Sequence, residues 1–131
     1  MENIQEKMKE LFGGSCYCYC LEYLFGGNRT LKELTNAVLQ DWLSDFVGDD
    51  GYVSKPLSVV NRYVGKQYKD VKKPLIDSLD ELPEGLWIVE YRNGTKQHFV
   101  VANNNGVVFD PSGDSITVKK GKPFSYRLFV R

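Results

Sequence analysis

The hydrophobic pattern of this chain changes period once, near residue 65, and that change constrains the fold more than any other feature. Before it, apolar residues recur at the spacing of amphipathic helices, as Leu31, Leu34 and Val38 do. After it, short runs rich in Val, Ile, Phe and Tyr are separated by turn signals such as Asn93-Gly94. Helices followed by hairpin-linked strands predict an α+β fold, with a helical part at about 1–65 and an antiparallel sheet part at about 66–131.

Caps and glycines divide the first half into four predicted helices. Ser15, Thr30 and Ser54 are the expected N-caps, and Thr30 with Glu33 forms a capping-box pattern. The second helix is apolar nearly all round, which predicts that it is the buried central helix of the domain. The four helices are expected at about residues 2–12, 16–25, 30–46 and 54–64.

The second half predicts a series of strands, expected at about residues 67–71, 85–92, 97–102, 107–110, 115–119 and 124–130. A three-residue loop, Asn104-Asn105-Gly106, would place its glycine at the left-handed position that such loops need. The resulting register puts His98 and Asp110 on the same face of the hairpin as diagonal neighbours. A two-residue loop would put them on opposite faces.

Composition predicts one domain covering residues 1–131 and excludes several function classes. The 17 basic and 17 acidic side chains give a formal net charge of zero, which argues against a broad nucleic-acid surface. No apolar run approaches the roughly 18 residues of a membrane span. The charged N-terminal segment lacks the apolar region of a secretory signal, so a cytoplasmic protein is expected. Three cysteines within five positions do not resemble a disulfide framework.

Three residues carry the strongest functional signal. Cys16 is expected at a helix N-terminus, where free amides and the helix dipole stabilise a thiolate and a developing oxyanion. His98 is the only histidine, so any cysteine–histidine chemistry must use it. Asp110 can hold the imidazole in one tautomer, and the three residues together predict a nucleophile, a base and an orienting carboxylate.

Each of these residues also has a structural interpretation. Cys16 can be a buried inert thiol, His98 a hydrogen-bonded sheet histidine and Asp110 a turn residue before proline. Cys18 and Cys20 are expected to be structural. A zinc-stabilised module is an alternative on ligand count, although a C-x-C-x-C pattern on a helix spreads its sulfurs around the axis.

The segment Gly14-Ser15-Cys16, followed by Leu21 and Leu24, resembles the nucleophile helix of papain-like cysteine peptidases. The runs His98-Phe99-Val100-Val101 and Gly106 to Pro111 are similar to the histidine and aspartate strands of the bacteriocin-leader-processing (C39-like) branch. The last segment, 115–131, resembles small uncharacterised papain-like domains of bacteria and phages. Over about residues 14–131, the resemblance implies a papain-like fold and cleavage of a peptide or amide bond by Cys16, His98 and Asp110. It implies a peptide or protein substrate or partner, and no cofactor or metal.

The chain departs from that family at one position. Glu10 stands where papain-like peptidases usually carry an oxyanion-hole glutamine, and a carboxylate there would repel an oxyanion. The Cys16 amide or the Ser15 hydroxyl is then the expected donor. The alternative function is a catalytically weak or inactive papain-like binding protein, such as a phage or mobile-element inhibitor of a host protein. Exposed aromatic residues away from Cys16, among Tyr17, Tyr19 and Tyr52, would favour it. Oligomeric state is not predicted.

Overall fold

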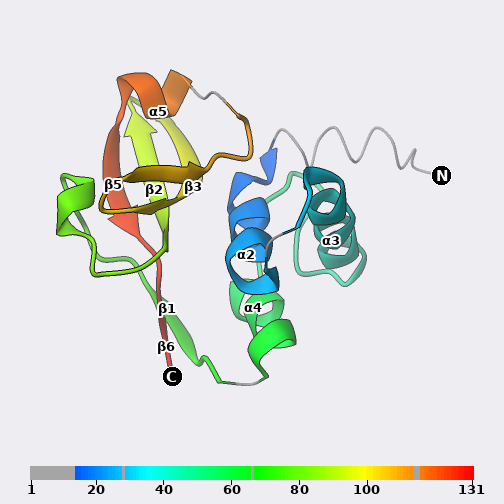
Figure 1. Cartoon of the computed structure of the whole chain (residues 1–131). Coiled ribbons are helices and arrows are strands. Elements are labelled where there is room, and N and C mark those ends of the chain that lie inside the picture. The colour runs from blue at the N-terminus through cyan, green and yellow to red at the C-terminus, as the bar shows by residue number, and fades with distance from the viewer. Residues whose placement is uncertain (1–13, 28, 66, 114–115) are drawn as a thin grey trace.

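The computed structural model describes residues 14–27, 29–65, 67–113 and 116–131 of the 131-residue chain, and its elements form a mixed α+β architecture (Figure 1). The expected helix at 2–12 lies outside the described residues. The described helices are α2 (Cys16–Gly26), α3 (Leu31–Leu43), α4 (Pro56–Val64) and α5 (Ile116–Lys120), with a short 3-10 helix η1 (Leu79–Glu81). The strands are β1 (Asp70–Lys72), β2 (Trp87–Asn93), β3 (Lys96–Asn103), β4 (Gly106–Phe109), β5 (Lys122–Tyr126) and β6 (Leu128–Val130).

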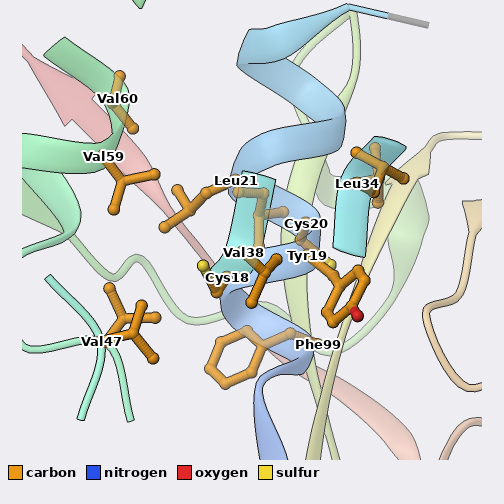
Figure 2. Packing of buried hydrophobic residues seen from close by; sticks show 13 residues of the cluster. Cys18, Tyr19, Cys20, Leu21, Leu34, Val38, Val47, Val59, Val60 and Phe99 are labelled. Carbon is orange, nitrogen blue, oxygen red and sulfur yellow. The ribbon is translucent and has the colours of Figure 1, made fainter. Parts of the chain in front are cut away.

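Helix α2 is the central helix, as its sequence predicts, because it contacts α3, α4 and β3. In Figure 1 it lies between the main sheet and α3, with α4 below it. Its first turns contribute Cys18, Tyr19, Cys20 and Leu21, which are at most 1% exposed. Figure 2 shows these side chains packed with Leu34 and Val38 of α3, Val59 and Val60 of α4, Val47, and Phe99 of the sheet. The core thus joins the helical part to the strand that also carries His98.

Two of the predicted N-caps differ in the structure. The Thr30–Glu33 capping box is confirmed, because each side chain accepts from the other residue's backbone amide. Ser15 occupies the N-cap position of α2 but its hydroxyl makes no capping bond. Ser54 is not a cap: its hydroxyl donates to the Phe46 carbonyl, and Lys55 takes the cap position of α4.

Helix α3 ends at Leu43, three residues before the predicted end. The reason is local: Asp45 adopts a left-handed backbone with φ of 67°, and the Phe46 amide bonds back to the Asp41 carbonyl. The chain then turns into an isolated bridge between Val47 and Val53. This bridge closes the loop on which the turn before α2 rests.

The main sheet has the order β4-β3-β2-β5 and is antiparallel throughout, while β1 and β6 form a separate two-stranded antiparallel sheet. The predicted strand at 115–119 was wrong, because residues 116–120 form α5. Val118 packs on a second core cluster, while Ile116, which would share a strand face with it, is 66% exposed. That cluster consists of Ile76, Leu82, Val89, Tyr91, Val100 and Ala102. The expected strand at 124–130 is two strands in different sheets, with buried Arg127 between them.

The hairpin that carries His98 and Asp110 differs from the predicted one in an instructive way. Asn103 pairs with Gly106, so the loop is the two-residue Asn104-Asn105 and not the three-residue loop. A bulge then shifts the register between Ala102 and Val101, so that Val101 pairs with Phe109. The extra residue of the bulge restores the register that the longer loop would have given. His98 and Asp110 therefore meet, although the predicted turn was wrong.

Candidate active site

The start of α2 is held by close backbone packing between two glycine turns. A side chain built on Gly51 would come within 2.7 Å of the Gly14 carbonyl carbon, and one on Gly14 within 2.7 Å of the Asp50 carbonyl oxygen. Gly51 also has a φ of 83°, a backbone that other residues rarely adopt. This contact fixes the segment that leads into Cys16, whose side chain is half-buried at the first position of the helix.

His98 and Asp110 form a short, nearly dry ion pair. Nε2 of His98 donates to Oδ1 of Asp110 at 2.6 Å, and the two side chains are 9% and 8% exposed. The same carboxylate oxygen accepts the Ser112 amide at 2.9 Å, which anchors the aspartate against the turn that follows β4. The geometry assigns Nε2 to the carboxylate and leaves Nδ1 as the ring nitrogen available to a thiol.

His98 also interacts with the side chain of Cys16. Burial by itself lowers the pKa of an imidazole, but hydrogen bonds to the Cys16 side chain and the Asp110 carboxylate outweigh it. Together they raise the pKa of His98 from 6.5 to about 8. The structure thus brings all three predicted residues together, across 82 positions of sequence between the cysteine and the histidine.

Two stacked aromatic pairs tie α2 to the strands that carry the histidine and the aspartate. Tyr17, next to Cys16, stacks on Phe99, next to His98, with ring centroids 4.8 Å apart. Tyr23, two turns along α2, stacks on Phe109 at 4.2 Å and nearly parallel. Phe109 directly precedes Asp110, so each ring pair lies beside one residue of the site. Tyr17 is largely desolvated, and burial raises the pKa of its hydroxyl to about 12.

Cys16 and His98 both line a groove of about 620 Å³. The loop at 51–54, the segment at 71–75 and strands β2, β3 and β5 also contribute to its lining. Two of the lining residues, Tyr52 and Leu75, are 70% and 72% exposed. The thiol is therefore reachable from solvent through a groove large enough for several residues of an extended peptide.

The two predicted oxyanion donors, the Cys16 amide and the Ser15 hydroxyl, differ in their position relative to the groove. Tyr19 makes the first backbone hydrogen bond of α2, to the Ser15 carbonyl, so the amides of Cys16, Tyr17 and Cys18 have no partner within the helix. Ser15 is fully buried, does not line the groove, and its hydroxyl has no hydrogen-bond partner within the described residues. The Cys16 amide is thus the better placed of the two. Glu10 lies outside the described residues.

The other two cysteines are buried in the hydrophobic core. Cys18 and Cys20 are fully buried, and the Cys18 thiol donates to Oδ2 of Asp41 at 3.3 Å. Burial raises the pKa of both thiols well above the ordinary value, which keeps them protonated. In the part of the chain that the structure describes, no group of three or more metal-ligating side chains comes together. The zinc alternative therefore finds no ligand set among these residues.

Sequence reasoning missed a second charged cluster in the wall of the groove. Arg127 donates to Oε1 of Glu90 at 3.1 Å and to the Ser125 hydroxyl at 2.8 Å, and all three residues are buried. The Arg127 guanidinium also lies over the Phe99 ring, 4.9 Å from its centroid. Only the charge of Glu90 next to the apolar run at 86–89 pointed to this cluster, because Arg127 lies 37 positions away.

Comparison of the chain with protein-family models, curated proteins and solved structures gives no match. The geometry of the groove and its side chains is therefore what bears on function. Among the described residues, no helix is long and apolar enough to span a bilayer.

Proposed function

We propose that this protein is a papain-like, thiol-dependent hydrolase that cleaves a peptide or amide bond through Cys16, His98 and Asp110. The observation that carries the proposal is one imidazole with two partners. Its Nε2 is bound to a buried carboxylate at 2.6 Å, and its pKa responds to the Cys16 side chain at the wall of an open groove. A histidine that served only the sheet would need neither the second partner nor the groove.

In the proposed reaction, His98 takes the proton of the Cys16 thiol and the thiolate attacks the carbonyl carbon of the substrate. The tetrahedral intermediate collapses with cleavage of the C–N bond, and the protonated His98 gives its proton to the leaving amine. A water molecule, deprotonated by His98, then attacks the thioester. Cys16 leaves as the thiolate and recovers the proton, and the acyl group leaves as a carboxylic acid. Asp110 keeps the imidazole oriented and stabilises its positive charge in both steps.

The oxyanion of that intermediate needs donors, and the start of α2 supplies candidates. The Cys16 amide lacks a partner in the helix, and the positive end of the helix dipole lies at the same place. This assignment needs no glutamine at position 10. No cofactor enters the reaction, and the free thiols of Cys16, Cys18 and Cys20 suit a reducing cytoplasm.

The competing function is an inactive binding protein on the same fold. It is favoured by a blocked groove or by a patch of exposed aromatics away from Cys16. Tyr19 is instead 1% exposed and Tyr17 is stacked in the site, so of the three tyrosines only Tyr52 is exposed, and it lines the groove. These observations favour the hydrolase.

The test is the rate at which iodoacetamide alkylates Cys16 as a function of pH, read by peptide mass spectrometry. Fast labelling below pH 7 that slows at least tenfold in His98→Ala supports an activated thiol. Cys18 and Cys20, buried in the same helix, serve as internal controls and should label only after unfolding. Labelling of Cys16 no faster than an ordinary thiol of pKa about 8.5 would contradict the proposal.

A further inference from the structure

The groove beside Cys16 carries a positive charge that the chain as a whole does not. Its charged lining consists of Lys73, Arg92 and Arg127 against the single carboxylate of Glu90, which leaves a formal excess of two positive charges before His98 is counted. The whole chain is neutral, but residues 91–131 contain seven basic and two acidic side chains. The sheet part that forms one wall of the groove is therefore the basic part of the molecule.

The carboxylate in the groove is already fully engaged. Oε1 of Glu90 accepts from Arg127 and from the Ser125 hydroxyl, and Oε2 accepts Nε of Arg92 at 2.7 Å. These bonds outweigh burial and lower the pKa of Glu90, so it stays ionised. Its charge is matched by the buried Arg127. The charges left for a ligand are those of Arg92 and Lys73.

The guanidinium of Arg92 is oriented by two contacts and has two donor nitrogens that could bind an anion. Its side chain is 46% exposed, its Nε is tied to Glu90, and its guanidinium carbon lies 3.6 Å from the centroid of the Phe124 ring. These two contacts fix the plane of the group. Within the described residues its two terminal nitrogens have no acceptor. They form the fork that binds both oxygens of a carboxylate, and little conformational entropy is left to lose on binding.

Arg92 lines the same groove as the proposed reacting groups Cys16 and His98. Its backbone pairs with Gln97 across β2 and β3, one position along the ladder from the pair formed by Tyr91 and His98. Lys73, which is exposed and has no ion pair among the described residues, also lines this groove. An anion bound by Arg92 would therefore lie in the groove that presents a substrate to Cys16.

We propose that the groove selects substrates with a carboxylate next to the scissile bond, and that Arg92, supported by Lys73, is the residue that determines this specificity. The inference rests on the proposed hydrolase function and names its substrate class: an acidic peptide. The carboxylate can come from an Asp or Glu side chain or from a free chain terminus, and the chemistry of recognition is the same for both.

The experiment compares alkylation of Cys16 by paired iodoacetyl reagents that differ only in charge. N-iodoacetyl-glycine and its amide test a terminal carboxylate, and N-iodoacetyl-aspartic acid α-amide and the asparagine equivalent test a side-chain carboxylate. In each case the thiolate displaces iodide. The acidic-to-neutral rate ratio is divided by that of 2-mercaptoethanol, a neutral thiol. We expect a ratio of about 10 in at least one pair, the value of one charge-assisted hydrogen-bonded contact.

The variants locate the effect. Arg92→Met should bring the ratio to about 1, whereas Lys96→Met removes an equal charge from the start of β3, outside the groove, and should keep it. Arg92→Lys keeps the charge without the fork and should lose most of the preference. A wild-type ratio near 1 in both pairs would overturn the inference. An undiminished ratio in Arg92→Met, or in Arg92→Lys if only that variant folds, would overturn it as well.

The two proposals fail in different ways. Slow labelling by the neutral reagents contradicts the activated thiol and hence the hydrolase. The ratio within each variant is independent of the absolute rate, so a carboxylate preference is still measurable in that case.

Discussion

The single histidine makes the charge state of the site directly observable. Asp110 and Cys16 together raise the pKa of His98 to about 8, and the unfolded chain should titrate near 6.5. A group whose pKa is raised by folding binds its proton more tightly in the folded state. Its contribution to stability is therefore complete below pH 6.5 and is lost as pH rises through about 8. Hydrogen bonding of one side chain is thus linked to the stability of the whole protein in that window.

Asp110→Asn tests the carboxylate as the partner of His98. The amide keeps the shape but not the charge, so the pKa of His98 should fall from about 8 toward 6.5. The measurement is an NMR titration of the imidazole protons, in which only one histidine can appear. Asp70→Asn, an exposed carboxylate on the two-stranded sheet, is the control and should leave the titration in place. An unchanged midpoint in Asp110→Asn would show that Cys16 alone sets the pKa.

At the scale of elements, the turn before α2 depends on one glycine contact. Gly51→Ala should destabilise the fold by about 2 kcal/mol or more, because alanine meets both a left-handed backbone and the Gly14 carbonyl. Gly94→Ala is the matched control: its φ is 62°, but no atom lies within 4 Å of the added methyl group. It should cost only the left-handed backbone term, about 1 kcal/mol. Urea unfolding of the two variants measures the difference, and equal losses would contradict a role for the close packing.

The second aromatic pair gives a prediction about alignment. Tyr23→Leu removes the stack on Phe109 and should cost about 1 kcal/mol beyond the lost area, while also lowering the pKa of His98 as Asp110 loosens. Trp87→Leu removes an edge-to-face contact with Tyr126 in the other core cluster. It should lower the free energy of unfolding similarly and leave the His98 titration alone. Chemical denaturation and an NMR titration of His98 test both variants. A shifted His98 pKa in both variants would mean that packing anywhere in the sheet affects the site.

The sequence predicted the elements that follow local rules. The Thr30 capping box, the buried helix at 16–25 and the strands around Val89 and Val100 are all present, because capping chemistry and apolar runs are read from neighbouring residues. Prediction failed where distant contacts decide the outcome. Residues 116–120 form a helix because only Val118 finds a core to pack against. The strand at 124–130 breaks at Arg127 because its guanidinium is bound to Glu90.

For the candidate site, too, local patterns were predictable and distant contacts were not. Cys16 at a helix start and His98 in a strand were readable from local pattern, and their pairing with Asp110 was expected from a face argument. The loop behind that argument was wrong, and a bulge no local signal announces restored the register. The groove wall of Arg92, Glu90 and Arg127 was not predicted, since its contacts join β2 to the residue after β5.

At the scale of the molecule, the helical part holds a buried proton. Asp41 is fully buried beside Glu22, and burial together with that neighbour raises the pKa of Asp41 to about 8. Hydrogen bonds from Asp41 and Tyr63 outweigh burial at Glu22 and lower its pKa, so Asp41 keeps the proton and Glu22 the charge. Arg29, from the loop before α3, and Arg62, from α4, pair with Glu22, and Arg62 also lies 3.0 Å from Oδ1 of Asp41.

Asp41→Asn mimics the protonated form and should change how stability depends on pH. In the wild type, this group stabilises the fold fully below about pH 4 and loses that contribution as pH rises toward 8. The variant should therefore gain stability relative to wild type by up to about 1.4 kcal/mol per pH unit between pH 5 and 7. Denaturation at pH 5, 6 and 7 measures it, with exposed Asp77→Asn as control. Parallel pH profiles for Asp41→Asn and wild type would contradict the assignment.

The two stacked ring pairs link the reactivity of Cys16 to the tertiary structure of the protein. With the buried core, they hold the helical part against the sheet at the point where Cys16 interacts with His98. The reactivity of the Cys16 thiol should therefore depend on how the helical part docks on the sheet part. The rate of Cys16 alkylation should therefore report on tertiary contacts. It should change when the helical part separates slightly from the sheet part, before spectroscopic probes of secondary structure change.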